Sequence, residues 1–264
     1  MPRSLASALA DLESVVEGLP GAVVGFSGGA DSALLAYLAR RGLGRSRSLA
    51  VTAVSASLAP EELEDCRALA TEWDLDWQPV ATRELDRPEY RANGRDRCYH
   101  CKSELMDALE RFATRGTVVL GVNTDDLSDH RPGQEAARER GARFPFVEAG
   151  LSKDAVRSIS RELGLRTAAK PAAACLASRV PYGTAVSFEV LDRVGRAESG
   201  LRRLGFAALR VRHYGDSARI ELPLADLAEA VEEREALVAA VKAAGYRYVT
   251  LDLEGLRSGN LNSA

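Results

Sequence analysis

The feature that most constrains the fold is a glycine-rich loop at residues 27–32, with the sequence SGGADS. The apolar run GAVVGF (21–26) before it is typical of a short buried strand, and the pattern of DSALLAYLARR (31–41) after it predicts a helix. Two glycines and a helix N-terminus let backbone N–H groups turn toward one point, as in phosphate-binding loops. Asp31 fits such a site as the ligand of a cation that bridges phosphates. The order of strand, loop and helix therefore predicts an α/β fold with an anion site in the loop.

This loop differs from the two commonest nucleotide-binding motifs. It lacks a Gly-Lys-Ser/Thr ending, which excludes the usual P-loop, and it lacks the G-x-G-x-x-G fingerprint of dinucleotide sites. Ser27 and Ser32 add hydroxyl donors beside Gly28 and Gly29. The alternative is an ordinary turn with an acidic residue in the first turn of the helix.

Strands and helices alternate through the first two thirds of the chain. Apolar runs predict further strands at 48–56, 76–81 and 117–123, and helical spacing predicts helices at 5–19, 60–74, 102–114 and 152–163. Buried strands separated by helices predict a parallel sheet covered on both faces. Ligands of such sheets bind at the carboxyl ends of the strands, where we expect residues 27–32, 53–55 and 121–126. Ser55, Asn123 and Asp125 are therefore candidates for the same site as the loop.

The pattern changes after about residue 186. It predicts a helix at 187–203, strands at 207–213 and 217–222, a helix at 225–244 and a strand at 246–253. This order is typical of a small α+β domain. The turn-like segment VPYGTAVS precedes it, so we expect domains at 1–183 and 184–264.

Composition excludes several classes of protein. The 264 residues are 46% hydrophobic and 28% charged, which excludes a disordered chain. A net charge of −3 gives no support for a nucleic-acid partner. No apolar run reaches the roughly 18 residues of a membrane span, and charges interrupt the N-terminal segment. We therefore expect a soluble, cytoplasmic protein without a membrane partner.

Four cysteines are too few for a disulfide scaffold in a chain of this length, which leaves a metal or a reactive thiol open. Cys98 and Cys101 form a C-x2-C pair just before a predicted helix, and Cys175 follows much later. The pair alone is compatible with zinc, with redox chemistry or with two small buried side chains. Three thiolates could also hold an iron–sulfur cluster with one iron left open. Cys66, on a predicted helix, is expected to be a small buried residue.

The loop resembles the pyrophosphate-binding SGGxDS loop of the N-type ATP pyrophosphatases, also called PP-loop enzymes. Every fixed position of that motif is present. The resemblance implies that ATP is cleaved between its α- and β-phosphates and that AMP is transferred to a substrate oxygen. It also implies that Mg2+, with Asp31 as a ligand, accompanies ATP.

A narrower resemblance, to the LarE family of sulfur transferases, extends over residues 26–222. It rests on the segments FSGGADS, NGRDRCYHCK, GVNTDD, GLSKDAVRSISRELGL, KPAAACLASRVPYG and RVRHYGDSARIEL. The family makes the nickel-pincer cofactor of lactate racemase. The implied substrate is pyridinium-3,5-biscarboxylic acid mononucleotide, whose carboxylates are adenylated and converted to thiocarboxylates. Sulfide or another sulfur donor is the implied second partner.

The cysteines distinguish two forms of that family. One form sacrifices the sulfur of a single cysteine at the position of Cys175. The other holds a [4Fe–4S] cluster on three cysteines, which match Cys98, Cys101 and Cys175, and its open iron carries the sulfur to be transferred. This chain has the three-cysteine pattern, so we expect the cluster form, with these cysteines and Asp31 as the catalytic residues.

The resemblance also implies the remaining site residues and the assembly. Residues around ATP are Ser27, Gly28, Gly29, Asp31, Ser32, Ser55, Asn123 and Asp125. Residues around the mononucleotide are Ser178, Arg179, Glu198, Arg210 and Arg212, and Glu221 is a candidate metal ligand. Alternation along a strand puts Arg210 and Arg212 on one face, where two guanidinium groups suit a phosphate. A homo-oligomer, a hexamer by resemblance, is expected.

Two other functions remain open at this point. A tRNA-thiolating relative would use the same loop and cysteines. A zinc-stabilised nucleotide-binding module would need no catalysis. An amidating ligase or NAD synthetase would leave the three cysteines unexplained.

Overall fold

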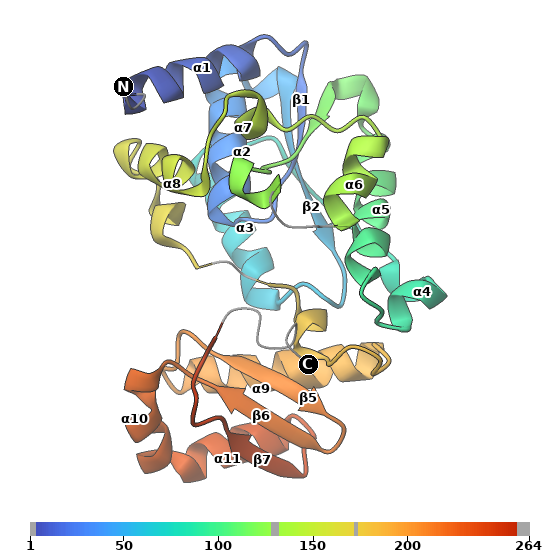
Figure 1. The fold of residues 1–264 in the computed structure, drawn as a ribbon, viewed down its shortest axis with the longest axis vertical. Helices are drawn as coiled ribbons and strands as arrows, with labels where there is room; N and C mark the ends of the chain where they lie inside the picture. The colour runs from blue at the N-terminus through green and yellow to red at the C-terminus, as the bar shows by residue number, and fades with distance from the viewer. Residues whose placement is uncertain (1–3, 128–131, 172–173, 258–264) are drawn as a thin grey trace. The chain divides into compact units, whose positions relative to one another are not determined.

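A computed structural model describes residues 4–127, 132–171 and 174–257 of the chain (Figure 1). The chain forms two compact units. The first consists of Met1–Ser55, Glu62–Glu84 and Cys98–Ala173, and the second of Ala56–Glu61, Leu85–Arg97 and Ala174–Ala264. Residues 174–183 thus belong to the same unit as the C-terminal part. The predicted domains, 1–183 and 184–264, stay a prediction.

The first unit is built on a parallel sheet of four strands in the order β3-β2-β1-β4. The strands are β1 (Ala22–Gly25), β2 (Ser48–Val54), β3 (Trp77–Ala81) and β4 (Thr117–Val119). The helices are α1 (Leu5–Glu17), α2 (Ala30–Leu43), α3 (Pro60–Glu72), α5 (Arg97–Glu110), α6 (Pro132–Glu139), α7 (Pro145–Glu148) and α8 (Lys153–Glu162). The predicted α/β class with a parallel sheet is confirmed.

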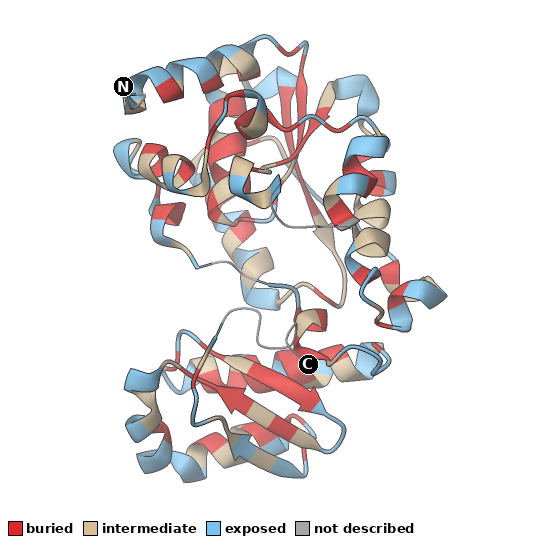
Figure 2. Ribbon diagram, viewed as in Figure 1, coloured by how far each residue is buried: buried red, intermediate tan, exposed pale blue. Residues whose placement is uncertain are grey.

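Alternate residues of the strands pack into two separate hydrophobic cores. Ala22 and Val24 of β1 pack in a cluster with α1, α2, α3 and α8. Val23, between them, packs in a second cluster with α5 and α6. Helices therefore cover both faces of the sheet, and strands β1, β2 and β4 are largely buried, whereas the edge strand β3 is mostly exposed (Figure 2). This double cover is why the strands read as continuous apolar runs.

The strand order places a switch point between β1 and β4. The connection from β1 leads to β2 on one side, whereas β4 lies on the other side of β1. Ligands of open α/β sheets bind at the carboxyl ends of the strands at such a point. Residues 27–32 follow β1 and residues 121–126 follow β4, so both segments lie at this edge.

The second unit contains a three-stranded sheet in the order β5-β6-β7. Its strands are β5 (Arg210–Tyr214), β6 (Ser217–Glu221) and β7 (Tyr248–Leu251), and its helices are α4 (Pro88–Arg91), α9 (Phe188–Arg203), α10 (Leu227–Glu232) and α11 (Arg234–Ala243). Strands β5 and β6 are antiparallel and β6 and β7 are parallel. Apolar side chains of α9, α10 and α11 form one core with the sheet. The predicted smaller α+β region at the C-terminus is confirmed.

Several element boundaries differ from the sequence-based expectation. Helix α5 begins at Arg97, so the C-x2-C pair lies in its first turn rather than before it. Strand β4 ends at Val119, because the next N–H, that of Leu120, turns to the carbonyl of Arg143. The helix expected at 225–244 is interrupted at Glu233, whose backbone leaves the helical region. Within the described residues, no helix is long and apolar enough to cross a membrane.

Candidate active site

The loop at residues 27–32 ends at an uncapped helix. Gly29 is the N-cap residue of α2 and offers no side chain to the first-turn N–H groups. The Ser32 hydroxyl oxygen lies 3.1 Å from the Ser27 backbone nitrogen, whose N–H it accepts, and 3.0 Å from the Ser27 hydroxyl. It donates in turn to the Gly29 carbonyl at 3.2 Å. The two serines therefore close the loop on itself, and the N-terminus of α2 is left to bind an anion.

Gly28 cannot be replaced without strain. Its φ of +69° lies in the left-handed region, and a Cβ atom there would lie 2.9 Å from the sulfur of Cys66. Cys66 is fully buried on α3, as expected, and burial raises the pKa of its thiol to about 11. The loop thus rests on an uncharged thiol, and its glycine is required by both backbone angle and space.

Asp31, in the first turn of α2, faces the segment that follows β4. The Asn123 amide donates to an Asp31 carboxylate oxygen at 3.5 Å. The close approach needs Gly121, where a Cβ atom would lie 2.9 Å from the Asp31 carbonyl carbon. Burial and the nearby charge of Asp126 raise the pKa of Asp31. A divalent cation beside these carboxylates would offset their repulsion, which is the chemistry expected of a magnesium site.

Asp125 and Ser55, two further candidates for ATP, have partners of their own in the first unit. The Asp125 carboxylate accepts the Lys153 N–H at the start of α8 at 3.0 Å. The Ser55 hydroxyl donates to the buried carboxylate of Glu84. Both residues follow strands of the parallel sheet, as predicted, and their contact with ATP stays a prediction.

The cysteine pair lies on one face of α5. Cys98 and Cys101 are three residues apart, a spacing that puts side chains one above the other on a helix. The Cys98 thiol is exposed, and neither cysteine forms a disulfide. Desolvation lowers the pKa of Lys102, against the effect of the two neighbouring thiols. Two thiols one turn apart, of which that of Cys98 is exposed, are chemically suited to hold an iron ion.

Cys175 belongs to the second unit, whereas Cys98 and Cys101 belong to the first. It precedes a short 3-10 turn at Leu176–Arg179, and its thiol is exposed. Within the described parts of the chain, no three His, Cys, Asp or Glu side chains converge as a metal site. The donor set, three thiols outside disulfides of which two are exposed, still matches the chemistry of a cluster.

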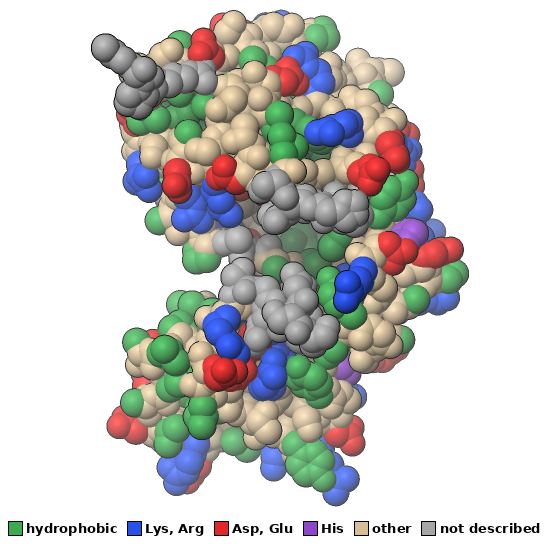
Figure 3. All heavy atoms as spheres, in the orientation of Figure 1, with side chains coloured by type: hydrophobic (Ala, Val, Ile, Leu, Met, Phe, Trp, Pro, Cys, Tyr) green, Lys and Arg blue, Asp and Glu red, His purple; other side chains and the backbone are tan. Residues whose placement is uncertain are grey.

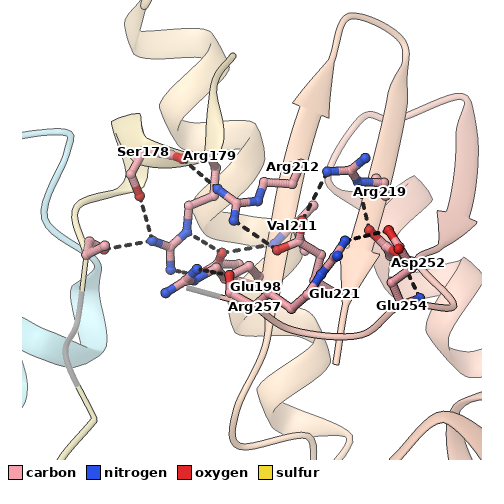
Figure 4. A network of polar contacts seen from close by, with 12 residues as sticks. Ser178, Arg179, Glu198, Val211, Arg212, Arg219, Glu221, Asp252, Glu254 and Arg257 are labelled. Carbon is pink, nitrogen blue, oxygen red and sulfur yellow. Dashed lines mark hydrogen bonds and ion pairs between the residues drawn. The ribbon is translucent and has the colours of Figure 1, made fainter. Parts of the chain in front are cut away.

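The second unit contains an arginine cluster, which we define as Arg179, Arg210 and Arg212 with Glu198 and Glu221. Figure 4 labels Arg179, Arg212, Glu198 and Glu221 of this cluster. Glu198 is fully buried on α9, and its carboxylate accepts from Nε and Nη2 of Arg179, at 2.8 and 3.3 Å. Glu221 is fully buried on β6 and accepts from Arg212 at 2.9 Å. Each buried glutamate therefore compensates a buried guanidinium group.

These pairs also hold the segment that carries Cys175. Arg179 donates to the Ala174 carbonyl and to the Ser178 hydroxyl, both at 2.9 Å. Arg212 donates to the Ser178 carbonyl at 2.8 Å. The structure thus brings Ser178, Arg179, Glu198 and Arg212 together, and their contact with the substrate stays a prediction. Their donors are largely used within the protein, which favours a role in shaping the site.

Arg210 is the arginine of the cluster whose side chain makes the fewest hydrogen bonds within the described residues. Its hydrogen bond, at 3.0 Å, goes to the Arg257 carbonyl, and within the described residues no carboxylate pairs with it. Burial and the charges of Arg179 and Arg212 lower the pKa of Arg210. Uncompensated positive charge next to two other guanidinium groups is an anion site. Glu221, by contrast, accepts from Arg212 and Arg219, which leaves little room for the metal suggested for it.

The second unit also contains a buried group of hydrogen bonds, around Asn93 and Arg97, that the sequence-based expectations did not include. Asn93, fully buried, donates to the carbonyls of Val180, Pro181 and Thr184. Arg97 donates to the Asn93 amide oxygen and to the Ala177 carbonyl at 2.8 Å. The segment that leads into Cys98 is thereby fastened to the segment that follows Cys175. The Asn-Gly dipeptide at 93–94 is the signal that could have revealed it, because Asn93 has a φ of +55°.

Comparison with known proteins gives the same assignment for the loop. The family model described as NAD synthase matches residues 8–100, which include the loop and the C-x2-C segment's first cysteine. An uncharacterised protein of Synechocystis sp. is 48% identical over 98% of both chains. An uncharacterised protein of Methanocaldococcus jannaschii is 28% identical over 89% of this chain and 90% of its own.

A relative whose name states an activity is also similar to this chain over almost its whole length. The pyridinium-3,5-bisthiocarboxylic acid mononucleotide synthase of Lactiplantibacillus plantarum is 36% identical over 98% of this chain and 95% of its own. This coverage includes the loop, the cysteine segments and the arginine cluster. The chain therefore belongs to the LarE family of ATP-dependent sulfurtransferases, enzymes of the PP-loop superfamily.

Proposed function

We propose that this enzyme adenylates the carboxylates of pyridinium-3,5-biscarboxylic acid mononucleotide and converts them to thiocarboxylates for nickel-pincer cofactor synthesis. The observation that carries the proposal is the arginine cluster, which joins the Cys175 segment to an anion site within one unit. A mononucleotide supplies the anion, and its pyridinium carboxylates supply the groups to be activated. The printed name of the L. plantarum relative supports the same substrate class.

The first step is adenylation. A carboxylate oxygen of the substrate attacks the α-phosphorus of ATP, the bond to the β-phosphate oxygen breaks, and pyrophosphate leaves. The N-terminal N–H groups of α2 stabilise the charge on the leaving pyrophosphate, and Asp31 would hold a Mg2+ ion that offsets part of that charge. Asn123 orients the Asp31 carboxylate for that cation. The product is an acyl-adenylate.

The second step replaces an oxygen by sulfur. A sulfur nucleophile attacks the activated carbonyl carbon, and the bond to the AMP oxygen breaks. A [4Fe–4S] cluster on Cys98, Cys101 and Cys175 would supply a sulfide ligand at its open iron. Arg179 and Arg212 hold the backbone on either side of Cys175 for this step. Adenylation is needed because a carboxylate is a poor electrophile and its oxygen is a poor leaving group.

A small anionic substrate also fits the charge of the protein better than RNA does. Acidic side chains lie among the basic ones on the face of the molecule in Figure 3. The net charge is −3. A protein that binds tRNA needs many phosphate contacts, which such an interspersed pattern does not favour.

The test is anaerobic reconstitution with iron and sulfide, followed by an assay for AMP and thiolated product. Bound iron and sulfide with repeated turnover support the cluster form. Cys98→Ala and Cys101→Ala should then lose iron and repeated turnover, while adenylation still releases pyrophosphate. Full repeated turnover in both variants contradicts the cluster. Loss of one sulfur from Cys175 by mass spectrometry after a single turnover establishes the sacrificial form instead.

A further inference from the structure

Lys170 lies beneath the phosphate loop, and neither the substrate assignment nor the cysteine chemistry uses it. It precedes the segment that leads to Cys175 and belongs to the first unit. Its ammonium group lies 3.2 Å from the Gly28 carbonyl oxygen, 2.7 Å from a Glu62 carboxylate oxygen and 2.5 Å from an Asp65 carboxylate oxygen. The side chain is 18% exposed. Three acceptors thus surround one ammonium group at the back of the loop.

Two carboxylates on α3 keep the Lys170 side chain positively charged. Burial alone would lower the pKa of Lys170, but hydrogen bonds to Asp65 and Glu62 outweigh burial and raise the pKa. The ammonium group therefore stays protonated, with one donor directed at a backbone carbonyl. A charged donor on a carbonyl makes a stronger bond than a neutral donor does.

Because the peptide bond is planar, the contact of Lys170 with the Gly28 carbonyl also fixes the direction of the Gly29 N–H. The bond between Gly28 and Gly29 is trans, so its N–H points away from its C=O. Because Lys170 holds the Gly28 carbonyl, the Gly29 N–H points away from Lys170. No side chain caps the helix that begins after Gly29, and no hydrogen bond from this N–H is found within the described residues. An oriented donor without a partner is what a phosphate oxygen requires.

We propose that Lys170 is a positioning residue of the phosphate loop: it holds the Gly28 carbonyl so that the Gly29 N–H faces the β- and γ-phosphates of ATP. The inference rests on the proposed binding of triphosphate by residues 27–32. It does not depend on the mononucleotide or on the source of sulfur. Glycines at 28 and 29 leave this peptide free to rotate, which is why an external residue has to fix it.

Arg166 provides a matched control. It pairs with Asp65 at 2.7 Å and with Glu72 at 2.9 Å, both on α3. It shares a carboxylate with Lys170 but does not contact the loop. Arg166→Met therefore removes ion pairs from α3 in the same way as Lys170→Met and leaves the Gly28 carbonyl bond in place.

The experiment measures binding of inorganic pyrophosphate, ATP and AMP to the full chain by calorimetry, with the unfolding midpoint of each variant. Lys170→Met should weaken pyrophosphate and ATP about 10- to 100-fold and leave AMP within about twofold, because AMP has no β- or γ-phosphate. Lys170→Arg, which keeps a charged donor, should recover most of the affinity. Arg166→Met should stay within about twofold for all three ligands. Lys170→Gln gives the same comparison if Lys170→Met does not fold.

Three outcomes overturn the inference. Wild-type affinity for pyrophosphate in Lys170→Met means that the peptide is oriented without the lysine. Equal losses for AMP and pyrophosphate, or equal losses in Lys170→Met and Arg166→Met, mean that the lysine only stabilises the fold. Absence of pyrophosphate binding in the wild type removes the proposed role of the loop itself, which is a separate failure.

Discussion

The phosphate loop of the first unit and the arginine cluster of the second offer hydrogen-bond donors to anions in opposite ways. The loop uses backbone N–H groups, which no substitution except one to proline removes, and depends on the conformation of Gly28 and the uncapped start of α2. The cluster uses guanidinium groups, and two of them, those of Arg179 and Arg212, pair with buried glutamates. The loop is therefore sensitive to shape, whereas the cluster is sensitive to charge. Substitutions that change only shape should therefore affect the loop, and substitutions that change only charge should affect the cluster.

The largest effect is expected from Glu198→Ala in the arginine cluster. The carboxylate accepts from Arg179, from Arg202 at 3.0 Å and from the Val211 N–H at 3.0 Å, and it is fully buried. Its removal leaves a guanidinium group buried without a counter-charge, which costs about 3–5 kcal/mol of unfolding free energy. Urea denaturation followed by circular dichroism measures the loss.

An exposed ion pair provides the control for that loss. Arg234 pairs with Glu235 on the surface of α11, so Arg234→Ala should change the unfolding free energy by less than about 0.5 kcal/mol. A loss below about 1 kcal/mol for Glu198→Ala contradicts the view that the glutamate compensates the cluster.

Gly28→Ala is expected to have the next largest effect, and it changes the shape of the loop without changing its charge. The positive φ and the 2.9 Å approach to the Cys66 sulfur should both distort the loop. We expect kcat/KM for ATP to fall about 100-fold, equivalent to about 2.7 kcal/mol, with KM for the mononucleotide unchanged. Steady-state release of pyrophosphate measures the change.

Two further variants separate space from backbone angle. A Cβ at Gly29 would meet only the Ser27 hydroxyl, at 3.6 Å, and its φ is negative, so Gly29→Ala should be much milder. Adding Cys66→Ala to Gly28→Ala removes the sulfur but keeps the backbone strain, so only part of the activity should return. Equal effects of Gly28→Ala and Gly29→Ala would show that the approach to Cys66 is irrelevant.

Arg210→Ala is expected to have a smaller effect and changes only charge. Its guanidinium group is the one in the cluster without a carboxylate partner among the described residues. KM for the mononucleotide should rise about 10- to 30-fold, equivalent to about 1.4–2 kcal/mol, which is at the lower end of what a hydrogen bond to a charged group contributes. KM for ATP should not change. An increase in KM for ATP alone would reassign Arg210 to the nucleotide site, and Arg210→Lys should show an intermediate KM for the mononucleotide.

The two sites differ in how far the sequence predicts them. The loop was predictable because SGGADS combines glycines, hydroxyls and a helix start in consecutive residues. The alternation of strands and helices likewise predicted the parallel sheet and the edge at which Asn123 meets Asp31. Local sequence carries these features, so local reasoning recovers them.

What the sequence did not predict depends on contacts between distant residues. Lys170 lies 142 positions from Gly28, and Asn93 lies 87 positions from Val180, so neither pairing has a local signal. The same reason explains Glu198 and Glu221, whose roles as charge partners appear only once their arginines are in place. The pairing of Arg179 with Glu198 on α9 likewise has no local signal, whereas the domain boundary near residue 183 rests on the turn-like segment VPYGTAVS alone.

The smallest expected effect concerns the neutral thiol on which the loop rests. Burial raises the pKa of Cys66 from 9.0 to about 11 in the folded protein. The unfolded chain therefore loses this proton first, so the folded state is fully favoured below pH 9 and loses that advantage as the pH rises toward 11. At pH 10 the loss is about 1.4 kcal/mol relative to pH 7, whereas Cys66→Ala lacks this component. Subtracting the unfolding free energy of Cys66→Ala from that of the wild type at each pH isolates the thiol from other titrating groups. A difference that is constant from pH 7 to pH 10 would mean that Cys66 is solvated, and Gly28 would then rest on a polar, accessible surface rather than on a buried thiol.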